Sequence, residues 1–514
     1  MNGAETLVKT LLASGIDTCF ANPGTSEMHF VTALDAHPEL RCILCLFEGG
    51  ASGAADGYYR MSGKVAATLL HLAPGFGNAF ANLHNARKAQ SGVFNIMGEH
   101  ASYHLQYESP LKGDTAGISQ AISHWTRTSE TAATVAADGA AAITAARANG
   151  GQIATLILPA NTAWEDAVAP AVAAPPAALR RPSANQIAAA IRALRLPGAA
   201  LMIDGTALHG ELATLAARIA KAAGCPLIQP CLVARMARGA GAARRTRMAY
   251  RIEENLPLMA DISNLVLCGA ARPAGFFAYP GMPSLPESPD CRITELCTPT
   301  MDYAWTLRAL VDALNAPHLT SDDLYPLHLP EIPHGPITLD AIGQTIAALM
   351  PAGTIVVDEA ISSSAPIFAA TTHARAHDWL CVTGGAIGYG LPNAVGAAVA
   401  CPNRKVLALQ GDGSAMYTLQ SLWTMARERL DTTIIIFANK GYQILHYELA
   451  AMGAPKPGRN AAHIFDIIDP TLDWTALAHG HGVPATRVTD MTGFAAAFGE
   501  AMGERGPRLI EVVC

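Results

Sequence analysis

The sequence of 514 residues has few charged side chains, few aromatic side chains and no long apolar run. Charged residues make up 15% and aromatic residues 6%, whereas hydrophobic residues make up 50%. This hydrophobicity, with a net charge of only −7, excludes an intrinsically disordered chain. The negative charge and the lack of a basic tail argue against a nucleic-acid partner. No stretch reaches the ~18 uninterrupted apolar residues of a membrane span, so we expect no membrane partner.

The eleven cysteines lack the even number and the regular spacing of a disulfide framework. Reduced thiols of this kind are typical of the cytoplasm, where we expect the protein. The first residues include an acid, Glu5, and indicate an amphipathic helix rather than a signal peptide. One Cys-x-x-Cys pair, Cys42 and Cys45, lies in an apolar run that we interpret as a strand with buried thiols.

Two proline-rich stretches, residues 165–183 and 315–336, divide the chain into thirds. Each third alternates short, fully apolar runs with longer helical patterns, which indicates parallel strands covered on both faces. We therefore expect an α/β protein with three doubly wound parallel-sheet domains, over residues 1–166, 183–315 and 336–514. Ligands of such sheets bind at the carboxyl ends of the strands.

The strongest local signal is an apolar strand at 406–410 that runs into Gly-Asp-Gly-Ser at 411–414, before a helix. Glycines at such a turn let the backbone approach an anion, and the helix N-terminus offers N–H groups to phosphate. The Asp412 carboxylate would repel a phosphate unless a divalent cation lay between them. A second apolar strand ends in Asn-Lys-Gly-Tyr at 439–442, which adds an amide oxygen and carbonyls. Together the two turns predict a Mg²⁺–phosphate site.

The first third contains three further polar segments. An apolar strand is expected to end at Phe47, and Glu48 follows at once, before a helix of small residues. Glu48 is either a desolvated carboxylate for acid–base chemistry or a simple complement to the helix N-terminus. A glycine turn at 22–26 and His71, before a second turn at 74–78, add polar groups. A lone histidine at a strand end is more often structural than catalytic, so His71 gains weight only from its neighbours.

The order of these segments resembles the thiamine diphosphate-dependent decarboxylases and synthases over nearly the whole chain. The motifs NPGTSE, LHLAPGFGNA and GGAIGYGLP are most similar to benzoylformate decarboxylase, and the general family includes acetolactate synthase. The resemblance implies a pyrimidine-binding, a central and a diphosphate-binding domain, in that order. It implies thiamine diphosphate and Mg²⁺ as cofactors, a small 2-oxo acid as substrate, and a homodimer or homotetramer with active sites between subunits. It leaves open whether the central domain binds FAD or another nucleotide.

The resemblance also implies a role for each matching residue. The implied Mg²⁺ ligands are Asp412, Asn439 and the Gly441 carbonyl. The implied cofactor-binding residues are Gly385, Ile387, Gly411, Gly413, Ser414 and Tyr442. Glu48 would bond to the pyrimidine ring of a cofactor held by the other subunit, and Thr25 and His71 would face the substrate.

By the same resemblance, the protein is a lyase that decarboxylates a 2-oxo acid through an enamine intermediate, with or without carboligation. One alternative is an acetolactate synthase-like carboligase of two 2-oxo acids, although Gly49 stands where those enzymes usually have glutamine. The other is a non-catalytic cofactor-binding subunit, against which Glu48 speaks, because cofactor binding alone does not require that acid. The second active-site histidine of benzoylformate decarboxylase has no match, and the nearest segment offers Phe276 and Phe277.

Two features remain open at this stage. Glu448, six positions after Tyr442, either faces the substrate, where it would disfavour an acidic tail, or is a solvated helix residue. Six arginines between 235 and 251 form either a phosphate site or, more often in such clusters, a solvated face or subunit contact. These arginines are Arg235, Arg238, Arg244, Arg245, Arg247 and Arg251.

Overall fold

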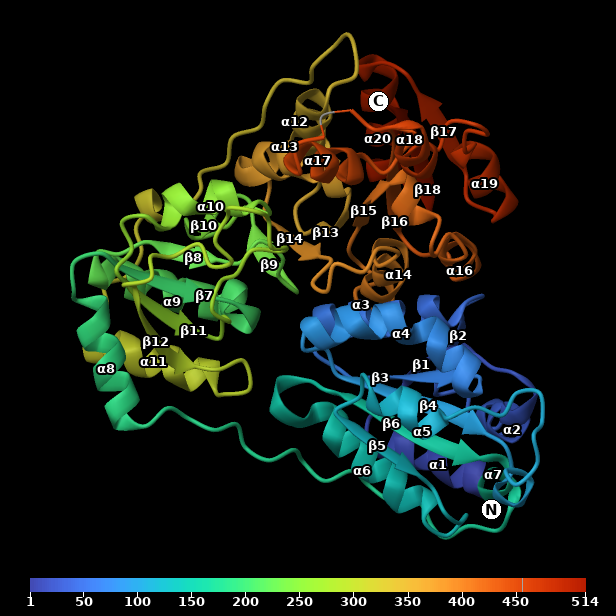
Figure 1. The fold of residues 1–514 in the computed structure, drawn as a ribbon. Helices are drawn as coiled ribbons and strands as arrows, with labels where there is room; N and C mark the ends of the chain where they lie inside the picture. Colours follow the sequence, from blue (N-terminus) through green and yellow to red (C-terminus); the bar gives the residue numbers. More distant parts are fainter. Residues whose placement is uncertain (455) are drawn as a thin grey trace.

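The computed structural model describes residues 1–454 and 456–514 and contains three α/β units (Figure 1). The first unit holds a parallel sheet with strand order β2-β1-β3-β4-β6-β5. Its strands are β1 (Thr18–Asn22), β2 (Arg41–Leu44), β3 (Ala66–Leu70), β4 (Val93–Glu99), β5 (Trp125–Thr128) and β6 (Ile153–Pro159). Its helices are α1 (Gly3–Ala13), α2 (Met28–Asp35), α3 (Glu48–Ser62), α4 (Leu72–Lys88), α5 (Thr115–Gln120), α6 (Val135–Arg147) and α7 (Ala160–Trp164).

The central unit holds a second parallel sheet, with strand order β10-β8-β7-β11-β12. Its strands are β7 (Ala199–Ile203), β8 (Leu227–Gln229), β10 (Thr246–Arg247), β11 (Asn264–Cys268) and β12 (Arg292–Cys297). Its helices are α8 (Ala184–Leu194), α9 (Gly210–Ala223), α10 (Ile252–Met259) and α11 (Tyr303–Leu314). The proline-rich stretches predicted as linkers lie between α7 and α8 and between α11 and the first helix of the third unit.

The third unit holds a seven-stranded sheet with order β17-β18-β16-β15-β13-β14-β9, parallel except for the last pair. Its strands are β9 (Met236–Arg238), β13 (Ile355–Glu359), β14 (His377–Cys381), β15 (Val406–Gly411), β16 (Thr432–Ala438), β17 (Ala485–Val488) and β18 (Arg508–Val513). Its helices are α12 (Leu339–Leu349), α13 (Ser364–Ala370), α14 (Gly390–Ala400), α15 (Asp412–Ala415), α16 (Ser421–Arg427), α17 (Gln443–Ala451), α18 (Arg459–Phe465), α19 (Trp474–Gly480) and α20 (Met491–Gly503). The three sheets confirm the predicted α/β class with doubly wound parallel sheets.

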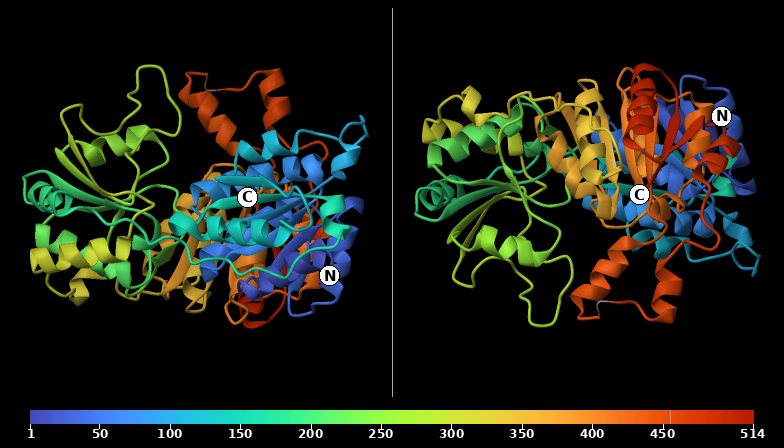
Figure 2. Two further views of the ribbon diagram at one scale, coloured as in Figure 1. Left: turned by 90° about the horizontal axis from the view of Figure 1, so that it is seen from below. Right: turned by 90° about the horizontal axis from the view of Figure 1, so that it is seen from above.

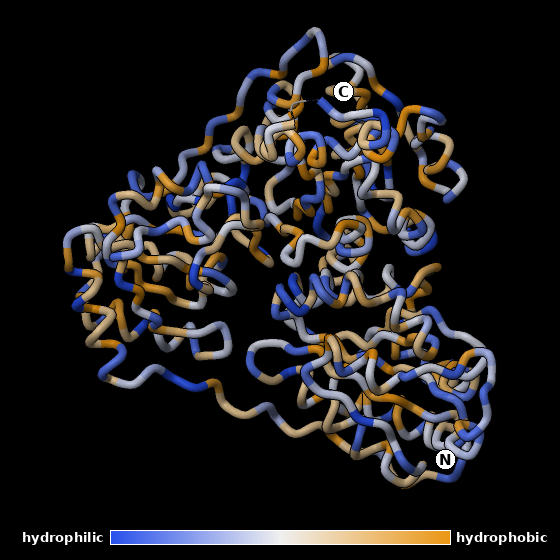
Figure 3. The backbone as a smooth tube through the Cα atoms, in the orientation of Figure 1, coloured by the Kyte–Doolittle hydropathy of each residue, from blue (hydrophilic) through white to orange (hydrophobic). Residues whose placement is uncertain are grey.

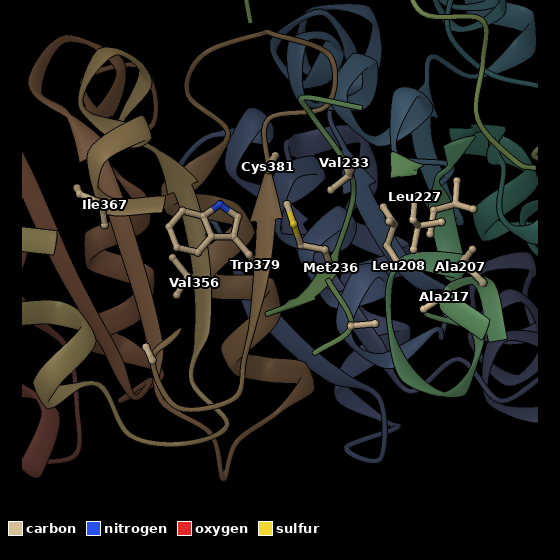
Figure 4. Packing of buried hydrophobic residues seen from close by; sticks show 14 of the residues in the cluster. Ala207, Leu208, Ala217, Leu227, Val233, Met236, Val356, Ile367, Trp379 and Cys381 are labelled. Carbon is tan, nitrogen blue, oxygen red and sulfur yellow. The ribbon is translucent and has the colours of Figure 1, made fainter. Parts of the chain in front are cut away.

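The central and third units are joined by β9, which comes from the central stretch of sequence but pairs with β14. Figure 4 shows Met236 of β9 between Trp379 of the third sheet and Leu208 of the central unit. Part of the arginine-rich segment stabilises this junction. Arg235 forms an ion pair of 2.8 Å with Asp378, and the Arg238 guanidinium lies 4.9 Å from the Trp379 ring centroid. These two arginines are therefore neither a phosphate site nor a solvated face.

The first and third units meet where α3 packs on α14, and the contact is close because both helices are rich in glycine. A Cβ added at Gly57 would lie 2.1 Å from the Asn393 carbonyl oxygen, and one added at Gly396 would lie 1.9 Å from the Ala54 carbonyl oxygen. Next to this contact, Arg60 forms a buried ion pair of 2.6 Å with Asp56 on the same helix.

The apolar residues form cores that cross the borders between units. One cluster contains residues of the central and third sheets, and another contains residues of the first and third sheets. In Figure 3 hydrophobic stretches accordingly run through the interior of each unit. Among the residues described, no helix combines the length and the apolar character needed to cross a bilayer.

The structure corrects two expectations about the segment before Glu48. The strand expected to end at Phe47 ends at Leu44, because β2 is an edge strand and the chain then turns into α3. The same edge position leaves Cys42 exposed, so only Cys45 of the Cys-x-x-Cys pair is buried. All eleven cysteines are free thiols.

The close packing of α3 on α14 is testable by adding single methyl groups. Gly57→Ala and Gly396→Ala are each expected to lower the free energy of unfolding by about 1–3 kcal/mol, because the contact is with rigid helix backbone. Gly499→Ala in α20 is the matched control: its added Cβ would lie an ordinary 3.8 Å from Leu349. Alanine there is expected to stabilise the helix by about 0.5–1 kcal/mol. The midpoint of urea unfolding measures both effects, and equal midpoints for all three variants would contradict the close packing.

Candidate functional site

The strand orders identify where ligands are expected to bind. In the first sheet the chain leaves β1 for β2 on one side and β3 on the other, so the topological switch point lies between β1 and β3. In the third sheet the switch point lies between β13 and β15 by the same reasoning. Doubly wound sheets bind ligands beyond the carboxyl ends of the strands at this point. The residues that follow these four strands therefore define two candidate clusters.

In the third unit, Asp412 follows β15 and begins the short helix α15. Its carboxylate accepts hydrogen bonds from the backbone N–H of Gly413 at 2.8 Å and of Lys440 at 2.6 Å. Burial raises the pKa of Asp412, and the two N–H groups act in the opposite direction. Because Lys440 lies in the second predicted turn, this bond brings the two turns together, as the sequence predicts.

The second turn, at 439–442, has a constrained backbone. Lys440 has a φ of +61°, and the Asn439 side chain accepts a hydrogen bond of 3.2 Å from the Gly441 N–H. The Tyr442 ring lies against the first turn, since a Cβ added at Gly413 would be 2.6 Å from that ring. The Lys440 N–H bond and the Tyr442 ring therefore hold the 439–442 turn against the Asp412 turn.

The loop at residues 384–390, which carries Gly385 and Ile387, is fixed by Glu359 at the end of β13. The buried Glu359 carboxylate accepts hydrogen bonds from the backbone N–H groups of Gly388 at 2.6 Å, Tyr389 at 3.1 Å and Gly390 at 2.7 Å. Burial raises the pKa of Glu359 to about 8, although the three N–H groups act to lower it. Sequence reasoning missed Glu359, although Glu359 stands at the end of a buried strand and Asp412 directly follows one.

The other end of this loop is bound by Asn85 of the first unit, which is fully buried. The Asn85 side-chain oxygen accepts bonds from the N–H groups of Gly384 and Ala386, and its nitrogen donates to the Ala386 carbonyl at 2.8 Å. All of the amide's polar atoms are thus used to hold the loop backbone. Asn85 was also missed, because its partners lie about 300 positions later in the sequence.

In the first unit, Glu48 is the first residue of α3 and is buried. Its carboxylate accepts a hydrogen bond of 3.0 Å from the Asn78 side chain on α4. Gly75 separates Glu48 from His71: a Cβ added there would lie 2.8 Å from a Glu48 oxygen and 3.3 Å from the His71 Cβ. The structure therefore places Glu48 and His71 in one cluster.

His71 follows β3 and is bound to Glu27, which follows β1 across the switch point. Nδ1 of His71 lies 2.9 Å from Glu27 Oε2, and the Glu27 carboxylate also accepts bonds from the Gly24 N–H and the Ser26 hydroxyl. Glu27 is 4% exposed. The predicted residue Thr25 is exposed, and it is its neighbours that bind His71. Glu27 lies inside the NPGTSE motif but was not singled out from the sequence.

Backbone strain accompanies these clusters. Leu72, Ile361 and Lys440 have left-handed φ values of +49°, +48° and +61°. Each stands two positions after the end of a strand that borders or neighbours a switch point, namely β3, β13 and β16. Residues without glycine's freedom adopt this conformation where the surrounding structure over-determines it, and such positions concentrate at functional sites.

The two clusters have separate hydrogen-bond partners within one chain. The Glu48 side chain bonds to Asn78, whereas Asp412 bonds to Gly413 and Lys440. Within residues 1–454 and 456–514, no group of three or more His, Cys, Asp or Glu side chains is arranged to hold a metal ion. A cation at Asp412 would therefore need amide, carbonyl, phosphate or water oxygens as further ligands, which is the coordination that Mg²⁺ prefers.

The central sheet has its own switch point, between β7 and β11, and there a tyrosine lines a cavity. Tyr303 is 7% exposed, and its hydroxyl donates to the Gly269 carbonyl at 3.1 Å. A Cβ added at Gly269 would lie 1.8 Å from the Tyr303 ring. This cavity has a volume of about 470 Å³, and Gly205 and Thr206 line it together with Tyr303.

Comparisons with known proteins agree with this arrangement. A model described as the thiamine pyrophosphate enzyme N-terminal TPP binding domain matches residues 1–121, and one for the C-terminal TPP binding domain matches residues 363–512. The chain is 47% identical over 519 residues to a Mycobacterium tuberculosis protein named "Putative acetolactate synthase large subunit IlvX", covering 100% of this chain and 99% of that protein.

Two more distant similarities also extend over nearly the full length. Benzoylformate decarboxylase of Pseudomonas aeruginosa is 27% identical over 549 residues, covering 97% of this chain and 96% of that protein. The structure of a thiamine diphosphate-dependent 4-hydroxybenzoylformate decarboxylase from Rhodococcus jostii superposes with a TM-score of 0.82 over 100% of this chain and 99% of that chain. At 23% identity, this last similarity shows a shared fold.

The buried Glu359 gives a pH-dependent expectation. Its pKa is about 8 in the folded chain against an ordinary 4.5, so its contribution to stability is fully present below pH 4.5 and is lost as the pH rises towards 8. The loss is at most about 1.4 kcal/mol per pH unit. Glu359→Gln cannot ionise, but its NH₂ group would face a backbone N–H donor, at a cost of about 1–3 kcal/mol.

The difference in unfolding free energy between the wild type and Glu359→Gln is therefore expected to be largest near pH 5 and to shrink towards pH 8. Urea unfolding of both proteins across this range measures it. A difference that stays constant with pH would contradict the raised pKa of Glu359.

Proposed function

The chain belongs to the thiamine pyrophosphate-dependent enzymes, and from that premise we propose that it binds thiamine diphosphate with Mg²⁺ and decarboxylates a 2-oxo acid. The observation that carries this proposal is the pair of clusters at two switch points. One combines a buried carboxylate with amide and carbonyl oxygens around Asp412. The other combines a buried carboxyl group, that of Glu48, with the Glu27–His71 pair.

The proposed Mg²⁺ ligands are Asp412, Asn439 and the Gly441 carbonyl. The donor set fits the ion, because a buried carboxylate with a raised pKa gains from a neighbouring cation, and all three donors are oxygen atoms. Gly411, Gly413 and Ser414 would hold the diphosphate at the start of α15. Tyr442, packed on Gly413, would close this side of the site.

The 384–390 loop is proposed to contact the reacting part of the cofactor through Gly385 and Ile387. Glu359 and Asn85 hold this loop from opposite ends, so the loop is pre-organised before any ligand binds. When bound, thiamine diphosphate supplies a carbon nucleophile and an electron sink for the bond that loses CO₂.

Glu48 is proposed to hold a proton towards the pyrimidine ring of the cofactor. The Glu48 carboxyl group is fixed by its burial and by the hydrogen bond that the Asn78 amide donates to it. Because the Asn78 NH₂ group is a donor, it does not take the proton from Glu48. Because the Glu48 and Asp412 clusters have separate hydrogen-bond partners within one chain, we propose that Glu48 serves a cofactor bound by a second copy, in a homodimer or homotetramer.

His71 is proposed to move a proton to or from the substrate. An ionised carboxylate can accept hydrogen bonds but cannot donate them. Glu27 therefore fixes a proton on Nδ1 of His71. Nε2 is then the nitrogen that gives or takes a proton. Thr25, exposed beside this pair, is proposed to face the substrate carboxylate.

We further propose that the functional domains span residues 1–166 for pyrimidine binding, 183–315 for the central domain and 336–514 for diphosphate binding. In support, β1 to β6, the central strands and β13 to β18 fall within these three ranges in order. The strand β9 is the exception, because it lies within the central range but pairs with the third sheet.

A second candidate activity is the joining of two 2-oxo acids, as in an acetolactate synthase. The name of the Mycobacterium tuberculosis relative favours it. The two activities share the first half of the reaction and differ in whether a proton or a second oxo acid is the electrophile, so the organic product distinguishes them.

The first experiment is therefore CO₂ release by the purified chain with thiamine diphosphate and Mg²⁺, given pyruvate and benzoylformate separately. An aldehyde from either acid supports the decarboxylase, and a branched hydroxy-oxo acid from pyruvate supports the carboligase. Cofactor binding without CO₂ from either acid would contradict the proposed substrate class.

Substitution of Glu48 separates catalysis from cofactor binding. Glu48→Gln is expected to leave Mg²⁺–cofactor binding intact and to lower kcat by at least about 100-fold, since the amide cannot hold the required proton. Asp412→Ala is expected to abolish Mg²⁺-dependent cofactor binding. Glu130→Gln, at an exposed position, is the control and should change neither. Isothermal titration calorimetry and CO₂ release measure the two properties, and normal turnover by Glu48→Gln would contradict the role of Glu48.

A further inference from the structure

Residues 272–287 of the central unit form a loop, which we call the aromatic loop, that is closed at its base. Arg272 forms an ion pair of 2.6 Å with the buried Glu287, and the Gly275 N–H donates to the Ser284 carbonyl at 2.8 Å. In both views of Figure 2 a long loop of the central unit lies alongside α17 and α18 of the third unit. The base contacts stay within the loop, so its tip is positioned by contacts with other segments.

At the tip, Phe276 lies over the backbone of the 384–390 loop. A Cβ added at Gly385 would be 2.8 Å from the Phe276 ring, and the centroid of that ring is 4.9 Å from Tyr250 and 5.0 Å from Phe277. Phe276 and Phe277 nevertheless remain 44% and 55% exposed. Large apolar side chains left accessible beside a proposed cofactor loop are suited to contact a ligand.

The tip is tied to α17 by Glu448. Its two carboxylate oxygens accept hydrogen bonds from the Tyr279 hydroxyl at 2.6 Å and, with a longer distance of 3.4 Å, from the Tyr250 hydroxyl. Glu448 is therefore not a solvated helix residue. Because α17 directly follows Tyr442, this tie connects the aromatic loop to the Asn439–Tyr442 turn as well as to Gly385.

The tie leaves the negative charge of Glu448 in place. Both donors are neutral hydroxyls, and burial together with Glu448 raises the pKa of Tyr279 to about 12, so the hydroxyl keeps its proton. Arg251, the nearby cation, is paired with Glu253 and half exposed. A substrate side chain at this place therefore meets aromatic rings with the Glu448 carboxylate behind them, whose charge also acts on Arg251.

We propose that Glu448 determines substrate specificity by holding the aromatic loop against the 384–390 loop, so that Phe276 and Phe277 form an apolar wall for the side chain of the 2-oxo acid, while the Glu448 charge excludes acids with a second carboxylate. The preferred class is then 2-oxo acids with uncharged apolar side chains. This inference rests on the proposed function, because it takes the 384–390 loop as the cofactor loop.

The test uses the full chain with thiamine diphosphate and Mg²⁺ and three acids of different side-chain charge. These acids are 4-methyl-2-oxopentanoate, 2-oxoglutarate and 5-guanidino-2-oxopentanoate. For the wild type, kcat/KM is expected to be highest for the apolar acid and at least about 100-fold lower for 2-oxoglutarate. A wild type that prefers the cationic or the anionic acid would overturn the proposal.

Two variants separate the tie from the charge. Glu448→Gln weakens the tie and removes the charge, whereas Tyr250→Phe with Tyr279→Phe breaks the tie and keeps the charge. Both are expected to raise KM for the apolar acid roughly tenfold with little change in kcat. Only Glu448→Gln is expected to reduce the discrimination against 2-oxoglutarate. Tyr447→Phe is the control, because Tyr447 lies on the same helix and is 50% exposed. Its KM and its discrimination against 2-oxoglutarate should match those of the wild type.

Limited chymotrypsin digestion reports on the tie independently of turnover. Both variants are expected to be cleaved faster than the wild type at Phe276 and Phe277, because their tip is released while its base stays closed. Unchanged cleavage in both variants, or an equal loss of kcat/KM for all three acids in Glu448→Gln, would overturn the role of Glu448. If the wild type binds the cofactor but turns over none of the acids, the proposed function itself has failed, and the specificity inference fails with it.

Discussion

The arrangement of the third unit depends on how the Glu359 carboxylate is placed. A buried carboxylate at the end of β13 needs hydrogen-bond donors, and it finds them in three successive backbone N–H groups at the start of α14. These three hydrogen bonds also fix the path of the 384–390 loop next to the Asp412 turn. Asn85 then completes this constraint from the first unit, because each polar atom of its amide binds the same loop. Burying the polar groups of Glu359 and Asn85 would cost free energy without the backbone groups of this loop as partners. The bonds that satisfy these two side chains therefore also hold the loop.

Asn85 can reach the loop only because the first and third units approach closely. That approach depends on glycines in α3 and α14, where the backbone of one helix contacts the backbone of the other. A chain poor in charged and aromatic residues is suited to such a contact, since small side chains leave helices little to separate them. The buried Asp56–Arg60 pair lies at the same junction and bonds across it to the Cys381 carbonyl. Composition therefore influences function here through the distance between units rather than through any single site.

The parts of this site that sequence alone predicts are those that depend on neighbours in the chain. The turns that contain Asp412 and Asn439 each follow an apolar strand, and parallel strands end on the same side of a sheet, so their proximity follows from local pattern. The end of the strand before Phe47 was misplaced, because an apolar run does not reveal that its strand lies at an edge and ends early. Glu359 and Asn85 were missed for a different reason. Their partners are backbone groups about 30 and 300 positions away, and backbone groups leave no trace in the residue types.

The first sheet and, apart from β9, the third share one strand order, whereas the central sheet has another, and their switch points have different contents. Between β13 and β15 lie the acids that bind a loop and the Lys440 turn, and between β1 and β3 lies the Glu27–His71 pair. Beside β7 and β11 the Tyr303 ring packs on Gly269 and lines a cavity instead. Topology thus provides a place for a ligand three times, and the residues directly after the strands decide whether the place is kept. The central unit contacts the proposed site through the aromatic loop, so it contributes a wall to a neighbouring pocket in addition to the cavity that Tyr303 lines.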